Sequence, residues 1–340
     1  MKTTKFAHYL NKFFTVHLPS TNGYTPMTID SYRYAFMLFL TFMEDQENIP
    51  ADEVEITDLT RQNTLKYLNW LHSERGNSIS TRNHRQAVLN SFIKYLMYEF
   101  PDYLAEFQAI LSIPVKKAPQ KEISYLKTDG AKLLFDQVDI DSKRGLRNYA
   151  ILTILFTTGI RVSELIGIRI KDVSLMQPPT LLVHGKGQKS RFVPLTKQAV
   201  AVLNNYVELM GLDNEGKQQA WLFKNHMDEQ FTRQGINYVI KKYADMSRNI
   251  NPDMIPSTLS PHKLRHSLAM ELVDSGVDLI YIRDLLGHVS VKTTEVYAKA
   301  STSKKREAIE AASKEIAPRE DAQWEENSRL KDWLKSFNRR

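Results

Sequence analysis

The stretch from Leu259 to Tyr297 constrains the fold and the chemistry of this chain more than any other. His262 and Arg265 stand three residues apart, so a helix places both side chains on one face. Gly276 and Gly287 are natural helix stops, and the apolar residues of this stretch recur at helical spacing. We therefore predict several short helices that hold a few polar side chains around one point.

These polar side chains are two imidazoles, a guanidinium and a phenol, supplied by His262, Arg265, His288 and Tyr297. A guanidinium beside an imidazole repels a metal cation, and the chain has no cysteine to supply a thiolate ligand. The set suits an anionic substrate and a tyrosine nucleophile better than a metal. We predict that no metal and no cofactor takes part.

The stretch resembles the C-terminal signature of the tyrosine recombinases, the DNA integrase family that includes the Xer recombinases. That signature is His-x-x-Arg, then Gly-His or Gly-Trp, then a tyrosine at about this separation. Arg161 and Lys186 match the arginine and lysine that precede it in the family. The resemblance covers roughly residues 20 to 300 and implies a mainly α-helical chain with a small β-hairpin. It also implies two domains that form a C-shaped clamp around DNA.

The resemblance assigns the central chemistry to three residues. Tyr297 would attack a DNA phosphodiester, leaving a 3′-phosphotyrosine and a free 5′-hydroxyl. The phosphotyrosine keeps the bond energy, so rejoining needs no ATP. Arg161 and Arg265 would bind the non-bridging oxygens, because a guanidinium is a planar and permanently charged fork. Two such cations can replace the Mg²⁺ that many nucleases need.

The resemblance assigns the proton transfers to three further residues. Lys186 would be the general acid for the 5′-oxygen, His262 would handle the tyrosine proton, and His288 would donate a hydrogen bond to the phosphate. We expect His266, although adjacent to the motif, to point away from the face of His262 and Arg265. The remaining histidines have no comparable partners and are expected to be structural or surface residues; examples are His8, His72, His84 and His226.

Size and composition agree with a soluble DNA-acting protein. With 340 residues the chain is long enough for two domains. Its net charge of +7 and pI of about 9.2 hint at a polyanionic partner. The N-terminus lacks the apolar core of a signal peptide, and the longest apolar stretch, Tyr149 to Ile160, is too short to span a bilayer. We predict a cytoplasmic, nucleoid-associated protein that contacts no membrane.

Residues 1 to 111 are expected to form a helical, SAM-like core-binding domain. Thr25-Pro26 opens one helix, a second runs near Leu59 to His72, and Ser80 can cap a third. The third helix resembles the DNA-facing helix of the recombinases, and its basic residues are Arg82, Arg85 and Lys94. These residues could simply form a solvated face, but phosphate contact is the preferred interpretation. The domain holds 10 basic and 12 acidic residues, so any grip on DNA must come from local clustering.

Residues 112 to 124 are expected to be a linker, since two prolines oppose a helix and three lysines keep the segment solvated. An extended link of about a dozen residues can reach ~40 Å, enough to cross a DNA duplex. Residues 125 to 300 would then form the catalytic domain, and residues 301 to 340 a C-terminal tail.

The catalytic domain opens with two predicted helices, near Thr128 to Val138 and Ser142 to Thr158. Arg161 and Glu164 follow at a turn, and they could be only a surface pair worth a few tenths of a kcal/mol. The resemblance favours the first arginine box of the recombinases, in which Glu164 supports the arginine.

Two strand-like runs, Thr180 to His184 and Ser190 to Pro194, flank a glycine-rich segment with Lys186 at its centre. A solvent-exposed turn is the plain interpretation, but the family carries its catalytic lysine on such a hairpin. Lys189 and Arg191 are expected to touch backbone phosphates. Helices are expected near residues 197 to 210 and 232 to 248, and the second would present three further basic residues to DNA: Arg233, Lys241 and Lys242.

The tail is longer than that of the Xer recombinases and carries apolar residues on one side of a predicted helix. They are Trp324, Leu330, Trp333, Leu334 and Phe337. Such a segment could pack on its own domain. In the recombinases the segment after the tyrosine docks on a neighbouring protomer, which is at least as good an interpretation.

The resemblance thus implies a site-specific tyrosine recombinase, and the long tail favours one that integrates or excises a mobile element. Its expected partner is double-stranded DNA with inverted-repeat sites, bound by a dimer per site and a tetramer in synapsis, with a possible partner recombinase. Three alternatives stay open: a Xer-type enzyme that resolves replicon dimers, a non-catalytic DNA-binding regulator, and a type IB topoisomerase. The intact catalytic set argues against the regulator.

Overall fold

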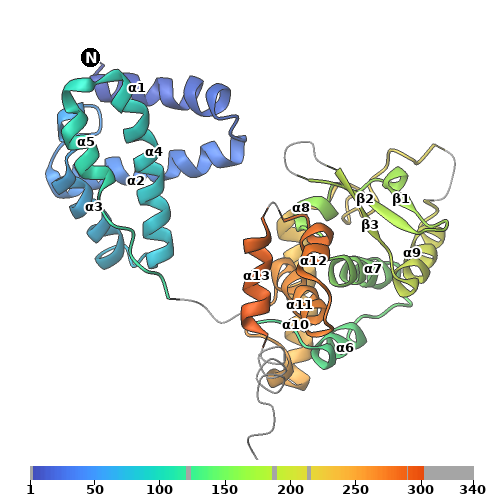
Figure 1. Cartoon of the computed structure of the whole chain (residues 1–340). Coiled ribbons are helices and arrows are strands. Elements are labelled where there is room, and N and C mark those ends of the chain that lie inside the picture. The colour runs from blue at the N-terminus through green and yellow to red at the C-terminus, as the bar shows by residue number, and fades with distance from the viewer. Residues whose placement is uncertain (1–2, 120–123, 186–189, 213–215, 289, 302–340) are drawn as a thin grey trace, which may run out of the picture. The chain divides into compact units, whose positions relative to one another are not determined.

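The computed structural model describes residues 3–119, 124–185, 190–212, 216–288 and 290–301. The chain forms two compact units, Met1–Lys121 and Glu122–Arg340 (Figure 1). The division falls inside the segment expected to be a linker. Helices dominate both units, and the described strands form one small sheet, as the sequence predicts. None of the described helices is long and apolar enough to cross a membrane.

The N-terminal unit is helical throughout its described part. Its helices are α1 (Lys5–Lys12), α2 (Pro26–Glu47), α3 (Arg61–Ser73), α4 (Ile79–Glu99) and α5 (Leu104–Leu111). A π-helical segment, Phe13–Thr21, continues α1. Aromatic rings fill the core between these helices, and Phe92 of α4 meets Phe13 and Phe36 edge to face. Such contacts suit aromatic quadrupoles and bury large apolar surfaces.

Local sequence signals set the helix ends in this unit. The helix α2 starts at Pro26, as predicted, because a proline lacks the amide hydrogen that the first helical turn leaves unbonded. Ser80 was predicted to cap the third helix, which is α4, and this prediction is wrong by two residues. Ser78 is the cap, and its hydroxyl accepts a hydrogen bond from the Thr81 amide at 3.2 Å.

The second unit surrounds a core helix, α7 (Lys143–Thr158), with further helices and the sheet (Figure 1). The others are α6 (Thr128–Asp136), α8 (Val162–Leu165), α9 (Lys197–Leu209), α10 (Arg233–Ile250), α11 (Pro261–Asp274), α12 (Leu279–Leu286) and α13 (Val291–Ala300). Ser142 caps α7, and Ser260 caps α11. The expected helices of this unit are therefore present, with ends that differ by a few residues.

The sheet has three antiparallel strands in the order β1 (Val173–Ser174), β2 (Thr180–His184) and β3 (Ser190–Pro194). The sequence predicts β2 and β3 with these bounds, whereas β1 is too short to predict. In the β2–β3 register Thr180 lies opposite Pro194, and His184 lies opposite Ser190. His184 and Ser190 are thus the last described pair of the two strands.

A small separate core lies between α11, α12 and α13 and carries the end of the signature stretch. It contains Ala269, Met270, Val273, Ile282, Leu286 and Tyr297. The three helices therefore form one packed group, visible in Figure 1 in orange and red. The side chain of Tyr297 belongs to this core rather than to the surface.

Candidate active site

The first arginine of the site stands at the turn between α7 and α8. Gly159 ends α7 with a φ of +60°, a backbone conformation that favours glycine, and Arg161 caps α8. Nη1 of Arg161 donates to Oε1 of Glu164 at 2.9 Å, and the Arg161 amide donates to Oε2 at 2.7 Å. These two bonds fix the direction of the arginine, whose side chain remains 42% exposed. An exposed charge on a fixed support is available to a ligand.

Glu164 binds two arginines, Arg161 and Arg191. The sequence analysis predicted the pair with Arg161 only. The carboxylate also accepts hydrogen bonds from Nη1 and Nη2 of Arg191 at 2.9 and 3.1 Å. Burial by itself raises the pKa of Glu164, but the hydrogen bonds from Arg191 and Arg161 outweigh it and hold the pKa below its usual value. The carboxylate is therefore ionised at neutral pH, and its single negative charge lies between two guanidiniums.

Arg191 has partners within the protein, and its expected contact with backbone phosphates stays a prediction. Besides the fork with Glu164, its Nε donates to the Leu285 carbonyl at 3.1 Å, and its side chain is 18% exposed. A bidentate pair with a buried carboxylate is a strong and directional interaction. Arg191 therefore ties β3 to the Glu164 support and to the end of α12.

The second arginine, Arg265 on α11, is buried, with 2% of its surface exposed. Nη1 donates to the Gly159 carbonyl at 2.7 Å, and Nη2 donates to the Leu286 carbonyl at 2.6 Å. Burial, followed by the charge of Arg161, lowers the pKa of Arg265 to about 10. Because that value lies well above 7, the guanidinium still carries its charge at neutral pH.

His288 follows the glycine that ends α12. Gly287 has a φ of +64°, and its carbonyl accepts a hydrogen bond from Nη2 of Arg161 at 2.9 Å. Nδ1 of His288 lies 2.9 Å from the hydroxyl of Thr294 on α13. Residues far apart in the sequence, at positions 161, 265 and 287–288, therefore meet at the end of α12.

The expectation that His266 points away from the site is wrong. His266 follows His262 by four positions on α11, so both rings lie on one side of the helix, with centroids 4.1 Å apart. Nδ1 of His266 lies 2.7 Å from the phenolic oxygen of Tyr297, whose side chain is 2% exposed. The sequence analysis assigned the contact with the tyrosine hydroxyl to His262. In this structure His266 makes that contact.

Burial lowers the pKa of each of the three histidines. Burial and then the charges of His262 and Arg265 lower the pKa of His266 to about 4. The pKa of His288 also falls to about 4, through burial and then Arg265. Burial and then Arg265 lower the pKa of His262 as well. Near pH 7 the rings are therefore neutral, and each can donate one N–H and accept one hydrogen bond.

Lys186 and Lys189 lie outside the described residues, so their roles remain predictions. The strand ends beside them are described. Nδ1 of His184 lies 2.8 Å from Oγ of Ser190, and Nε2 lies 3.4 Å from Oδ1 of the buried Asp172. The sequence analysis did not single out this chain of contacts. It joins the last residue pair of the hairpin to the body of the domain.

The sequence analysis placed Arg82 on an exposed face of the N-terminal unit, but the structure buries it. It is 2% exposed, and its Nη1 donates to the side-chain oxygens of Gln86 at 2.7 Å and Asn83 at 3.0 Å. Gln86 in turn donates to the Ile113 carbonyl at 2.7 Å. Gln86 therefore links α4 to the segment that follows α5, and Arg82 supports Gln86. Contact of Arg82 with a phosphate stays a prediction.

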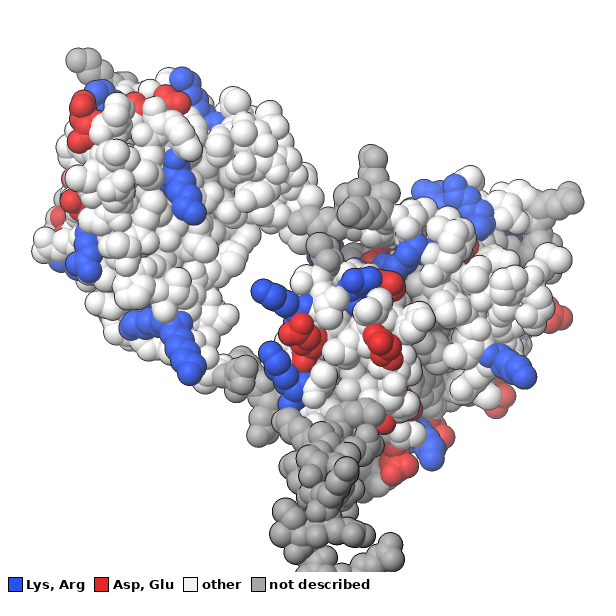
Figure 2. Space-filling view, in the orientation of Figure 1, with Lys and Arg blue, Asp and Glu red and all other residues white. Residues whose placement is uncertain are grey.

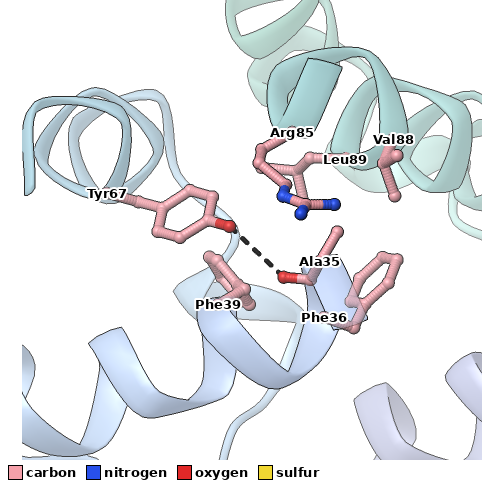
Figure 3. A pocket seen from close by; sticks show the side chains of 7 residues that line it. All are labelled: Ala35, Phe36, Phe39, Tyr67, Arg85, Val88 and Leu89. Carbon is pink, nitrogen blue, oxygen red and sulfur yellow. Dashed lines mark hydrogen bonds between the residues drawn. The ribbon is translucent and has the colours of Figure 1, made fainter. Parts of the chain in front are cut away.

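Arg85 is half-buried against α2. Nη1 donates to the Ser31 carbonyl at 3.3 Å, and the guanidinium lies 4.9 Å from the centre of the Tyr34 ring. Figure 3 shows this guanidinium among the side chains that line a cavity of about 10 Å³, beside the hydrogen bond from Tyr67 to the Ala35 carbonyl. Arg85 thus packs on its own domain, which limits its reach toward DNA.

The other basic residues proposed for DNA contact are exposed. They are Lys94 on α4 and Arg233, Lys241 and Lys242 on α10. Figure 2 shows basic side chains spaced apart on the visible face of the N-terminal unit, with most of that face uncharged. This distribution agrees with the balance of charges counted in the sequence.

Comparison with known families matches both units. A model described as the phage integrase family matches residues 124–304, and a model described as the phage integrase N-terminal SAM-like domain matches residues 12–99. The chain belongs to the phage integrase family. This membership makes the protein a site-specific tyrosine recombinase, an enzyme that acts on DNA.

Relatives of the recombinase include both integrases and Xer enzymes. The putative integrase/recombinase y4rC of Sinorhizobium fredii is 30% identical over 308 residues, covering 91% of this chain and 92% of the relative. Tyrosine recombinase XerC of Bacillus pumilus is 32% identical over 292 residues, covering 85% of this chain and 90% of the relative. The two relatives differ in their described roles, so they leave the biological process open.

Solved structures share the fold of the recombinase. The Tn1549 transposon integrase in complex with a circular intermediate DNA aligns with a TM-score of 0.69 over 91% of this chain and 100% of that chain, at 15% identity. The XerH recombinase in a post-cleavage complex with its difH substrate aligns with a TM-score of 0.66 over 85% of this chain and 80% of that chain, at 21% identity. At these identities the likeness supports the fold alone.

Proposed function

We propose that Tyr297 is the nucleophile of this recombinase and that Arg161 and Arg265 hold the DNA phosphodiester that it attacks. The observation that supports this most is the meeting of both guanidiniums at the end of α12. Arg161 reaches the Gly287 carbonyl from the α7–α8 turn, and Arg265 reaches the Leu286 carbonyl from α11. Two planar cations fixed at one point suit a phosphodiester anion.

The proposed reaction is a transesterification without any change of oxidation state. The phenolic oxygen of Tyr297 forms a bond to phosphorus as the bond from phosphorus to the 5′-oxygen breaks. The tyrosine proton leaves through His262, and Lys186 supplies a proton to the 5′-oxygen. The two arginines stabilise the charge on the non-bridging oxygens during the transfer. The reverse steps rejoin a strand.

His288 is proposed to donate a hydrogen bond to the phosphate. Its ring is neutral near pH 7, because burial lowers its pKa to about 4. When the Thr294 hydroxyl donates to Nδ1 at 2.9 Å, the single proton of the ring lies on Nε2. Thr294 would thereby set the tautomer in which His288 can donate to an anion.

Cleavage is expected to continue in excess EDTA, because arginines supply the positive charge that a metal supplies elsewhere. The substrate is a nicked duplex built on inverted repeats found in the DNA beside the gene. A covalent protein–DNA adduct on a denaturing gel measures the reaction, with and without the chelator. Loss of the adduct in EDTA and its return with Mg²⁺ would show that Arg161 and Arg265 do not suffice.

We propose integration or excision of a mobile element as the process served. One relative, which spans 91% of this chain, is described as a putative integrase/recombinase. Resolution of replicon dimers is the second candidate, since XerC and XerD relatives are just as similar. Inverted repeats at the ends of a mobile element around the gene would favour the first, and a single site near a replication terminus the second.

The proposed assembly is a dimer on each inverted-repeat site and a tetramer in synapsis, in the compartment that holds the DNA. Two domains joined by a linker would close around the duplex. Lys94, Lys241 and Lys242 are the exposed lysines that we propose for phosphate contact. Phosphate contacts make binding fall with salt, so replacing one such lysine should lower the salt dependence by about one counterion.

Residues 302–340 lie outside the described residues, and we propose that they bind a neighbouring protomer. Truncation after Ser301 keeps α13 and the contact of Ser301 with Asp274. We expect nearly unchanged binding to a half-site but weaker cooperative binding of two protomers, by ~5–150-fold, the usual range of coupling between sites. Gel-shift titration on half and full sites measures both. Unchanged cooperativity would mean that the tail packs on its own domain, and Trp333→Ala tests the apolar side alone.

A further inference from the structure

The side chain proposed as nucleophile is withdrawn from the surface in this structure. Tyr297 is 2% exposed, and its ring packs in the small core with Met270 and Val273 of α11 and with Ile282 and Leu286 of α12. A nucleophile must touch the phosphorus atom of a DNA strand that lies outside the protein. The phenol therefore has to leave this position, or the helices around it have to move, before it can attack.

The hydroxyl of the withdrawn phenol has a specific partner. Nδ1 of His266 lies 2.7 Å from it, a distance typical of a strong hydrogen bond. Burial raises the pKa of Tyr297, whereas burial and the charges of His262 and Arg265 lower the pKa of His266 to about 4. The proton consequently stays on the phenol, and the imidazole is neutral. With the ring proton on Nε2, Nδ1 is the acceptor of the bond from the Tyr297 hydroxyl.

The same facts argue against His266 as the base that removes the tyrosine proton. A proton on His266 would add a cation beside Arg265 and Lys263 in a partly buried place. The Tyr297 hydroxyl loses its hydrogen bonds to water when it is buried. A neutral imidazole that accepts a hydrogen bond from this hydroxyl replaces one of them. This arrangement stabilises the protonated phenol where it lies and does not prepare its ionisation.

We propose that His266 is a positioning residue that holds the nucleophile of the recombinase in a withdrawn, protonated state through the bond from the Tyr297 hydroxyl to Nδ1. Release of this bond precedes cleavage and makes exposure of the phenol a separate step. The proposal rests on the proposed function only in taking Tyr297 as the nucleophile. The bond itself is a property of the DNA-free protein.

Two substitutions separate the hydrogen bond from the volume of the ring. His266→Leu fills a similar space but offers no acceptor, whereas His266→Asn can place an amide oxygen near the position of Nδ1. His266→Gln sets its amide one methylene farther out and serves as a second test if the leucine variant does not fold. Thermal unfolding of each variant shows whether the domain is intact.

The first measurement needs no DNA and follows exposure of the phenol. Tetranitromethane nitrates accessible tyrosines, and peptide mass spectrometry locates the product; the chain has no cysteine to consume the reagent. Tyr281, which is 72% exposed, and Tyr206, which is 1% exposed, are internal references in the same unit. We expect nitration of Tyr297 to be about fivefold faster in His266→Leu, as for loss of one ordinary hydrogen bond, and near wild type in His266→Asn.

The second measurement is the single-turnover rate of covalent adduct formation on a nicked half-site. His266→Leu should react faster by a similar factor, and His266→Asn should react like the wild type. Slow nitration of Tyr297 in a folded His266→Leu variant would overturn the proposal. So would slower cleavage by that variant, which would instead indicate that His266 aligns or deprotonates the phenol. A wild-type adduct that does not involve Tyr297 would refute the proposed function and leave the nitration result standing.

Discussion

Replacing Tyr297 with phenylalanine is expected to abolish the covalent adduct with DNA while leaving DNA binding close to that of the wild type. The substitution removes only the phenolic oxygen, and the ring keeps its place in the core between α11 and α12. That oxygen is the atom proposed to attack the phosphorus, and no neighbouring group can replace it. A nicked duplex followed on a denaturing gel measures the adduct, and a gel shift measures binding.

Tyr281→Phe is the matched control, because the exposed Tyr281 lies on α12 of the same unit. This variant should form the adduct at the wild-type rate. The Tyr297→Phe variant loses the bond to His266, so its thermal unfolding is measured alongside. A covalent band that persists in the folded Tyr297→Phe variant would mean that another side chain attacks the DNA.

The fold could be predicted where local signals act alone. Thr25-Pro26 and Ser142 mark helix starts, and Gly159 and Gly287 mark helix ends with positive φ angles, all of which are properties of neighbouring residues. The two-residue strand β1 escaped prediction. It exists because it pairs with β2 at Val173 and Leu181, and such pairing leaves no pattern in so short a segment.

In the candidate site, too, contacts between residues close in the sequence could be predicted, whereas contacts between distant residues could not. The pair of Arg161 and Glu164 is three residues apart, so its spacing could be read directly. Arg191 pairs with Glu164 across 27 positions of chain, and its charge alone suggested DNA contact. A guanidinium on a strand gives no sign in the sequence of whether it faces a phosphate or a buried carboxylate.

His266 was misplaced for a different reason, since the information was local. Positions four apart on a helix share a side as closely as positions three apart, so His262 implies a place for His266 as much as for Arg265. The sequence could not reveal what His266 meets there. Its partner, Tyr297, is 31 positions away and comes close only because α13 packs against α11.

Arg265→Ala is expected to lower the rate of adduct formation by roughly 10³-fold or more, by analogy with arginines that stabilise phosphoryl transfer. Two of the five N–H groups of Arg265 go to the carbonyls of Gly159 and Leu286, which leaves others for a phosphate. The charge remains at neutral pH, because burial lowers the pKa only to about 10. Single-turnover cleavage at saturating protein measures the effect on the reaction separately from binding.

The alanine variant also removes a buried side chain and leaves two carbonyls without their donor, so folding has to be separated from chemistry. Arg265→Lys keeps a positive charge, but one ammonium cannot reach both carbonyls and a phosphate in the planar geometry of a guanidinium. We expect it to fold better than the alanine variant and still to cleave far more slowly than the wild type. If Arg265→Lys cleaves at the wild-type rate, charge alone is enough and the planar geometry of the guanidinium is not required. If Arg265→Ala unfolds near the wild-type temperature and cleaves normally, Arg265 only supports the end of α12.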